Sequence, residues 1–214
     1  MNLFRPPRDL FSEVTARKQS VNRDLSIVRD PQDELARIQE QIWVMRARDG
    51  DHDSFQRLVR KYERRLLYFV RRFENDADRA RDIVQDVWFT VFRKFPSLQA
   101  TEAFRVWLYR IAHSKVATSI RRQLREADAN RLLENSPSTQ VGGSERKLED
   151  AELVHRLLES VSADHREILT LRFLEDMRLR EIADVLKCSV GTVKSRLHYA
   201  KQAFRQAAQE LSDE

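Results

Sequence analysis

Apolar residues recur every three or four positions along most of the chain, which is the period of an amphipathic α-helix. The strict alternation that marks β-strands does not stand out in any segment bounded by turn residues. Glycine and proline cost about 1 and about 3 kcal/mol inside a helix, and the 214 residues include only four glycines and five prolines. The pattern therefore predicts an all-α protein.

The first predicted helix follows Asp30 and Pro31, whose residue types suit a helix N-cap and the first helical position. Its apolar stripe consists of Leu35, Ile38, Ile42 and Met45. The stripe stops near Gly50, where we expect the helix to end.

Three more helices are predicted before residue 126. The second lies within residues 52–73 and buries Phe55, Leu58, Val59, Tyr62, Leu66 and Phe69. The third is capped by Asp76 or Asp78 and ends at Pro96; its apolar face consists of Ile83, Val84, Val87, Trp88, Val91, Phe92 and Phe95. The fourth directs Phe104, Trp107, Leu108, Ile111, Val116, Ile120 and Leu124 inward. Four helices of this kind are enough for one small domain.

A polar stretch, NSPSTQVGG, divides the chain and is typical of a flexible linker. We expect an N-terminal arm without fixed structure at residues 1–30, a helical domain at 31–126, a linker at 127–148 and a smaller helical domain at 149–214. The second domain is predicted to contain four helices, at about 148–160, 164–174, 178–186 and 190–210.

The charges are separated along the chain, although the formal net charge is only +5. Residues 104–125 carry six Lys or Arg and no acid, and residues 187–205 carry five and no acid. Residues 74–86 are acidic instead, with five Asp or Glu against two Arg. Two basic segments favour nucleic acid, and the acidic segment indicates a partner of a second kind.

The segment RLREIADVLKCSVGTVKSRLHYAKQAF has the order of a helix-turn-helix motif. Ser189 can cap the second helix by accepting from the backbone of Thr192. The first helix is predicted to bury Ile182, Ala183 and Leu186, and the second to bury Val193, Leu197, Ala200 and Phe204. Lys187 lies in the turn, where a left-handed conformation would cost it about 1 kcal/mol or more.

Other classes of function find little support in the residues. The single cysteine, Cys188, excludes an internal disulfide, and the five histidines are too scattered for a metal site. We find no phosphate-binding glycine loop or nucleophile-base arrangement, so we expect no enzyme, no cofactor and no metal. The N-terminus lacks the apolar core of a signal peptide, and no window could span a bilayer, which predicts a soluble cytoplasmic protein without membrane insertion.

The segment SVGTVKSRLHYAKQAFR, with REILTLRFLEDMRLREIADVL before it, resembles region 4 of the extracytoplasmic-function (ECF) group of bacterial sigma factors. DADRARDIVQDVWFTVFRKF is similar to region 2.2, and FRVWLYRIAHSKVATSIRR to regions 2.3 and 2.4. The resemblance implies a subunit that binds core RNA polymerase and recognises the minus-ten and minus-thirty-five promoter elements, as duplex and as melted single strand.

Candidate binding residues form three groups. The exposed N-terminal turns of the second helix of the motif, matched to minus-thirty-five binding, carry Ser189, Thr192, Lys194, Ser195, Arg196 and His198. The group matched to minus-ten binding is Arg105, Arg110, Ser114, Lys115, Thr118, Arg121 and Arg122. The resemblance implies that Asp82, Gln85 and Asp86 contact the polymerase. Trp107 is assigned to the core, and the role of Tyr109 is open.

Two other functions are compatible with parts of this pattern. A helix-turn-helix regulator that acts without polymerase would explain the second domain but leaves residues 76–125 without a purpose. A sigma factor controlled chiefly by an anti-sigma protein is the other, because the arm at 1–30 exceeds what the family requires. Core polymerase binding separates the first of these from a sigma factor.

Overall fold

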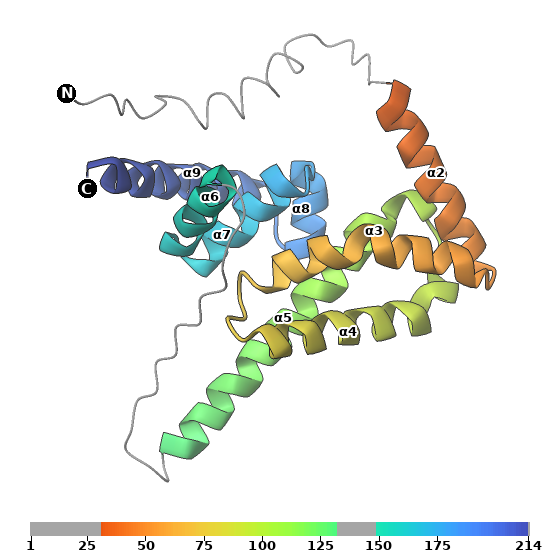
Figure 1. Ribbon diagram of the computed structural model, residues 1–214, viewed down its shortest axis with the longest axis horizontal. Helices are drawn as coiled ribbons and strands as arrows, with labels where there is room; N and C mark the ends of the chain where they lie inside the picture. Colours follow the sequence, from red (N-terminus) through yellow and green to blue (C-terminus); the bar gives the residue numbers. More distant parts are fainter. Residues whose placement is uncertain (1–30, 132–148, 214) are drawn as a thin grey trace.

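The computed structural model describes residues 31–131 and 149–213, and every regular element in those residues is helical (Figure 1). The first group of helices is α2 (Pro31–Arg48), α3 (His52–Val70), α4 (Ala77–Lys94) and α5 (Phe104–Arg131). The second group is α6 (Glu149–Ser160), α7 (Ala163–Leu169), α8 (Leu179–Leu186) and α9 (Val190–Asp213). The all-α prediction is therefore confirmed. The predicted arm at 1–30 and most of the predicted linker lie outside the described residues.

Helix α2 packs on α3, but through a different face from the one that the sequence predicts. Val44 is fully buried, and Glu40 accepts a hydrogen bond of 2.8 Å from the Tyr62 hydroxyl and forms an ion pair with Lys61. Of the expected apolar stripe, Ile42 is half-buried, but Leu35, Ile38 and Met45 are 65%, 45% and 46% exposed. That part of the prediction is wrong, because the apolar stripe of α2 exceeds the surface that α3 covers.

Helices α3 and α4 form the centre of the first domain. Asp76 caps α4 by accepting from the backbone amides of Asp78 (2.9 Å) and Arg79 (3.1 Å), which selects between the two predicted caps. The predicted faces are buried or half-buried except at Phe92, which is 56% exposed. The ring of Phe92 packs edge-to-face with that of Phe55, at a centroid distance of 5.6 Å.

Two short 3₁₀ turns, Phe95–Ser97 and Thr101–Ala103, connect α4 to α5. Pro96 lies in the first of them, as expected for a residue that ends a helix. Trp107 packs against Phe95 and Phe104, so its assignment to the core is confirmed. Leu124 is 60% exposed, which corrects the prediction that it points inward; α5 has by then run past the packed part of the domain.

The second domain consists of helices close to the four predicted ones. Ser162 caps α7, and the chain continues from α7 through a π-helical turn at Thr170–Leu174. The backbone amides of Glu175 and Met177 then donate to the carbonyls of Thr170 and Leu171, which closes the turn before α8. Helix α9 packs on α6, α7 and α8 and so provides the core of this domain.

The two domains contact each other chiefly through α5 and α8 (Figure 1). The buried apolar side chains of both domains form one continuous cluster, and charged groups add to the contact. Three pairs cross it: Arg65 with Glu175 (2.8 Å), Arg105 with Glu181 (3.3 Å) and His113 with Glu167 (2.7 Å). Interfaces of this polar kind within one chain resemble transient protein–protein contacts.

Candidate nucleic-acid interface

Helices α8 and α9 form the predicted helix-turn-helix. Lys187 ends α8 with left-handed backbone angles, φ 53° and ψ 45°. This conformation lets the Cys188 amide donate to the carbonyl of Ala183 at 3.1 Å, the bond that closes a Schellman-type helix end. The hydroxyl of Ser189 then accepts from the Thr192 amide at 3.0 Å, which confirms the predicted cap of α9.

The exposed side of α9 presents most of its predicted DNA-binding residues to solvent. Ser189, Lys194, Ser195 and His198 are exposed, whereas Thr192 and Arg196 are half-buried. The opposite face buries the four apolar residues that the sequence predicts, Val193, Leu197, Ala200 and Phe204. The first turns of α9 therefore offer hydroxyls, cations and the positive end of a helix dipole on one surface, the combination that binds phosphates and base edges.

Tyr199 was not predicted to belong to this surface, but it is 60% exposed and its ring lies beside that of His198. Its position in the sequence, two residues after the buried Leu197, would have indicated an outward direction. Lys201, in contrast, faces back toward its own domain, with its ammonium 5.6 Å from the centre of the Phe173 ring. Burial lowers the pKa of Lys201, and the neighbouring Arg205 and Arg172 add to the effect.

The basic surface of α5 is divided into exposed cations and cations held by other elements. Arg110, Ser114, Thr118, Arg121 and Arg122 are exposed. Lys115 and Arg105 are half-buried, because Lys115 lies 3.4 Å from Asp86 of α4 and Arg105 is held by the second domain. The sequence could not show this division, since each partner lies at least 29 positions away along the chain.

Helix α4 presents the residues assigned to polymerase binding along one exposed side. Asp82, Gln85 and Asp86 are all exposed there. The same side continues into Phe89, which is 61% exposed and has the Arg93 guanidinium 5.7 Å from its ring centre. The surface is therefore mixed, acidic near the start of α4 and aromatic near its end. The sequence pattern assigns no role to Phe89 and places the exposed Phe92 in the core.

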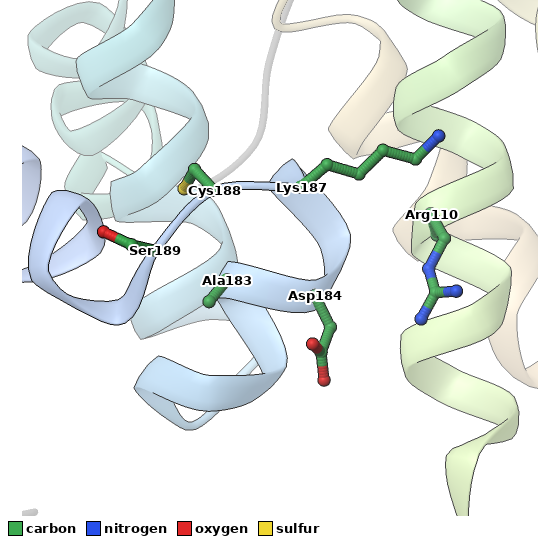
Figure 2. A pocket seen from close by; sticks show the side chains of 6 residues that line it. All are labelled: Arg110, Ala183, Asp184, Lys187, Cys188 and Ser189. Atoms are coloured by element: carbon green, nitrogen blue, oxygen red, sulfur yellow. The ribbon is translucent and has the colours of Figure 1, made fainter.

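A cavity of about 430 Å³ lies between α5 and the turn of the helix-turn-helix. Its lining residues are Arg110, Ala183, Asp184, Lys187, Cys188 and Ser189. Figure 2 shows Lys187 extending from the turn toward α5, on which Arg110 points into the same space from the other domain. The N-terminal cap of α9 is thus next to the basic surface of the first domain.

His113 and Tyr109 attach α5 to the other helices. Tyr109 is fully buried with its ring edge on Phe69, so it belongs to the core and not to a surface that stacks bases. The hydrogen bond between the His113 Nδ1 and Glu167 raises the pKa of His113 above its usual range, and the negative charge of Glu167 acts in the same direction against the effect of burial.

Within the residues that the structure describes, no cluster of three or more His, Cys, Asp or Glu is arranged to hold a metal ion. None of the described helices is both long and apolar enough to cross a bilayer. The candidate site consists of three surfaces. Two are basic helical faces on separate domains, and the third is the acidic and aromatic face of α4.

The chain has two helical domains, and one of them contains a helix-turn-helix with an exposed, basic face. These features define a helix-turn-helix DNA-binding protein. Comparison with known families sharpens this class. Residues 58–126 match sigma-70 region 2, and residues 151–204 match sigma-70 region 4. The chain belongs to the ECF group of RNA polymerase sigma factors, which are non-catalytic subunits of the polymerase.

Relatives and solved structures agree with this membership. The chain is 31% identical over 188 residues to RNA polymerase sigma-H factor of Pseudomonas aeruginosa, covering 83% of this chain and 97% of the relative. It is 30% identical over 185 residues to ECF RNA polymerase sigma-E factor of Escherichia coli, covering 80% and 95%. The fold is similar to that of CnrH in its complex with the cytosolic domain of CnrY (TM-score 0.57, 24% identity, covering 80% of this chain and 98% of the other). It is also similar to the sigma factor RpoE in its complex with the anti-sigma factor NepR from Bartonella quintana (TM-score 0.62, 22% identity, covering 72% and 96%).

Proposed function

We propose that this sigma factor binds core RNA polymerase through the exposed side of α4 and promoter DNA through α5 and α9, as a cytoplasmic initiation factor. The observation that carries the proposal is the separation of surfaces. Two basic helical faces lie on different domains, and α4 is mainly acidic near its start, where Arg79 and Arg81 are paired with Asp76 and Asp78. Surfaces of opposite charge on one chain suit two partners that must bind at the same time.

On α9, the proposed minus-thirty-five surface consists of the predicted residues Ser189 to His198, with Tyr199 added because it is exposed beside them. Lys194 is exposed and suits a phosphate contact, whereas the half-buried Arg196 is positioned by the helix and suits a base edge. On α5, the proposed minus-ten surface consists of the exposed residues Arg110, Ser114, Thr118, Arg121 and Arg122.

The polymerase surface is tested by replacing one aromatic side chain. We expect Phe89→Ala to weaken binding to sigma-free core polymerase by about tenfold or more, since exposed aromatics become buried anchors in protein interfaces. Leu35→Ala is the matched control, because Leu35 is exposed to a similar extent on α2 (65% against 61%). Equal affinities for the two variants would contradict the assignment of α4, and no core binding by the unmodified chain would overturn the proposed function.

The duplex-reading surface is tested with two lysines of the same helix. Lys194→Ala should weaken binding to promoter fragments by a similar factor for every sequence and lower the salt dependence by about one phosphate contact. Lys201→Ala should leave that salt dependence unchanged, because Lys201 lies over Phe173 and not on the exposed face. Equal effects of the two changes would refute this orientation of α9.

An alternative function, a helix-turn-helix regulator that does not join polymerase, predicts promoter binding without core and no change on adding core. Run-off transcription with purified core polymerase distinguishes the two functions directly. An anti-sigma protein as a further partner stays a prediction for this chain.

A further inference from the structure

Helix α2 has two apolar faces, and α3 covers one of them. The covered face buries Val44, with Glu40 bonded to Tyr62 on the same side. The second face consists of Leu35, Ile38, Ile42 and Met45, of which three are 45% or more exposed and Ile42 is half-buried. Figure 1 shows α2 at the edge of the first domain. We call the second face, made of these four residues, the α2 seam.

The spacing of the α2 seam is that of a helix that pairs with another helix. Its residues follow one another at intervals of three, four and three positions, which are the a and d positions of a heptad repeat. A stripe this narrow suits one partner helix, whereas a helix that lies on a broad core has a wider apolar face. Because α2 is already held on α3, pairing requires no further ordering of its backbone.

The α2 seam is complementary to itself when a second copy of the helix runs in the opposite direction. A two-fold axis halfway between Ile38 and Ile42 places Ile38 against Ile42 of the second copy, and the reverse. The same axis places Leu35 against Met45 of the second copy. Each apolar residue then meets an apolar residue, and reciprocal contacts of this kind close a dimer.

The polar residues beside the α2 seam are symmetric about the same axis. Gln39 and Gln41 flank its centre, where each faces its own counterpart and can exchange amide hydrogen bonds. Toward the ends, Glu34 lies opposite Arg48 of the second copy, and Arg46 adds to the positive charge of the last turn. A parallel pair would instead bring the two acidic starts and the two basic ends together. The charges therefore favour the antiparallel arrangement.

We propose that the α2 seam binds the α2 seam of a second copy of this chain, as an antiparallel two-fold pair. The proposal does not depend on the proposed function, because the surfaces assigned to polymerase and DNA lie on α4, α5 and α9. Interfaces below about 1,200 Å² are typical of transient complexes, so a contact of four residues a side should have a dissociation constant on the order of 0.1 mM. At the much lower concentrations of a core-binding titration, the chain is monomeric and Leu35 stays exposed.

Sedimentation velocity of the full chain at increasing concentration measures the pairing. We expect the unmodified chain to shift from monomer to dimer as the concentration passes the dissociation constant. Ile38→Gln should weaken the dimer by about tenfold or more, because it removes an apolar side chain from two places at the centre of the contact. Leu124→Gln is the matched control, since Leu124 is a similarly exposed apolar residue on α5, and it should leave the dimer unchanged. Circular dichroism should show the same helix content in both variants.

Exchanging charges at the ends of the α2 seam tests its direction. Glu34→Arg alone and Arg48→Glu alone each place like charges at both ends of an antiparallel dimer, so we expect either to weaken it by about threefold to tenfold at low salt. An equimolar mixture of these two variants restores opposite charges at both ends and should associate about as well as the unmodified chain. Salt near 1 M should remove the effect of the charges but not that of Ile38→Gln, because the screening length is then about 3 Å.

A spin label beside the axis locates the contact. Gln39→Cys, in a Cys188→Ser background, should give a short distance between labels that appears only as the dimer forms. Gln202→Cys on α9 is the control, because it is exposed but lies on the other domain, and it should give no such distance.

Four results would overturn the proposal. A chain that stays monomeric well above the expected dissociation constant lacks the contact. A dimer that Ile38→Gln and Leu124→Gln weaken equally has its contact elsewhere, and a mixture no tighter than either charge variant rules out the antiparallel direction. The fourth is a label at residue 39 that is immobilised in the monomer, which would assign the α2 seam to another segment of the same chain, or to polymerase if immobilisation requires added core.

Discussion

Lys187 adopts a backbone conformation that costs an ordinary residue free energy, so replacing it with glycine gives a direct test of the turn. Its angles, φ 53° and ψ 45°, lie in the left-handed region. A side chain with a Cβ pays roughly 1–2 kcal/mol there, and glycine pays almost none. Glycine also makes the unfolded chain more flexible, which offsets part of the gain. We expect Lys187→Gly to raise the free energy of unfolding by about 1 kcal/mol.

The assay is denaturant unfolding followed by helical circular dichroism, with Lys187→Ala as the matched control. Alanine removes the same charge and the same long side chain but keeps the Cβ and hence the strain. The difference between the glycine and alanine variants therefore isolates the backbone term. In a thermal scan, a gain of 1 kcal/mol should raise the midpoint by about 2–4 °C if the two domains unfold together.

A glycine variant no more stable than the alanine variant would refute this reasoning. It would mean that the turn relaxes to another conformation in solution and that the 3.1 Å bond from Cys188 to Ala183 is lost. Equal stability of all three proteins would lead to the same conclusion. A gain shared by glycine and alanine would instead point to the charge of Lys187, which opposes that of His113.

Three further changes test other parts of the structure. Asp76→Ala should lower the free energy of unfolding at neutral pH but not in acid. Backbone amide donors lower the Asp76 pKa, so the contribution of its carboxylate is present above about pH 4 and is lost as the pH falls further. Asp76→Asn should retain most of the cap. Leu66→Ala, at a fully buried position, should cost about 2–5 kcal/mol of unfolding free energy, whereas Leu35→Ala should cost less than about 0.5 kcal/mol. Asp86→Asn should raise the affinity of the free chain for a single-stranded oligonucleotide by up to about fivefold, by releasing Lys115, and Lys115→Ala should abolish that gain.

Features that depend on neighbours in sequence were predictable to within a residue or two. The cap at Ser189 and the buried face of α9 follow from residue types spaced three or four positions apart, and the structure confirms both. The strain at Lys187 was predictable for the same reason, because the turn between two helices requires a left-handed residue at a fixed position. The cap of α9, its buried face and the turn before it therefore depend on residues that are close together in the sequence.

Burial at the edge of the first domain was less predictable. Leu35, Phe92 and Leu124 all fit a helical apolar stripe, yet each is more than half exposed. Periodicity shows which side of a helix is apolar, but only the neighbouring helices determine how much of that side is covered. The exposed residues lie where α2, α4 and α5 extend beyond their partners, and on α4 the uncovered part is the surface proposed for polymerase.

The charge pattern shows most clearly where prediction from sequence stops. The sequence separates an acidic segment from two basic ones, but it cannot show that Arg105 pairs with Glu181 across 76 positions or that His113 pairs with Glu167 across 54. These pairs change the meaning of the basic helix α5. Counted along the chain, its cations form one surface for DNA; in the folded protein, Arg110, Arg121 and Arg122 remain exposed while Arg105 is already bound to carboxylates of the second domain. The positive charge that α5 offers to a DNA strand is therefore smaller in the folded protein than a count along the chain suggests.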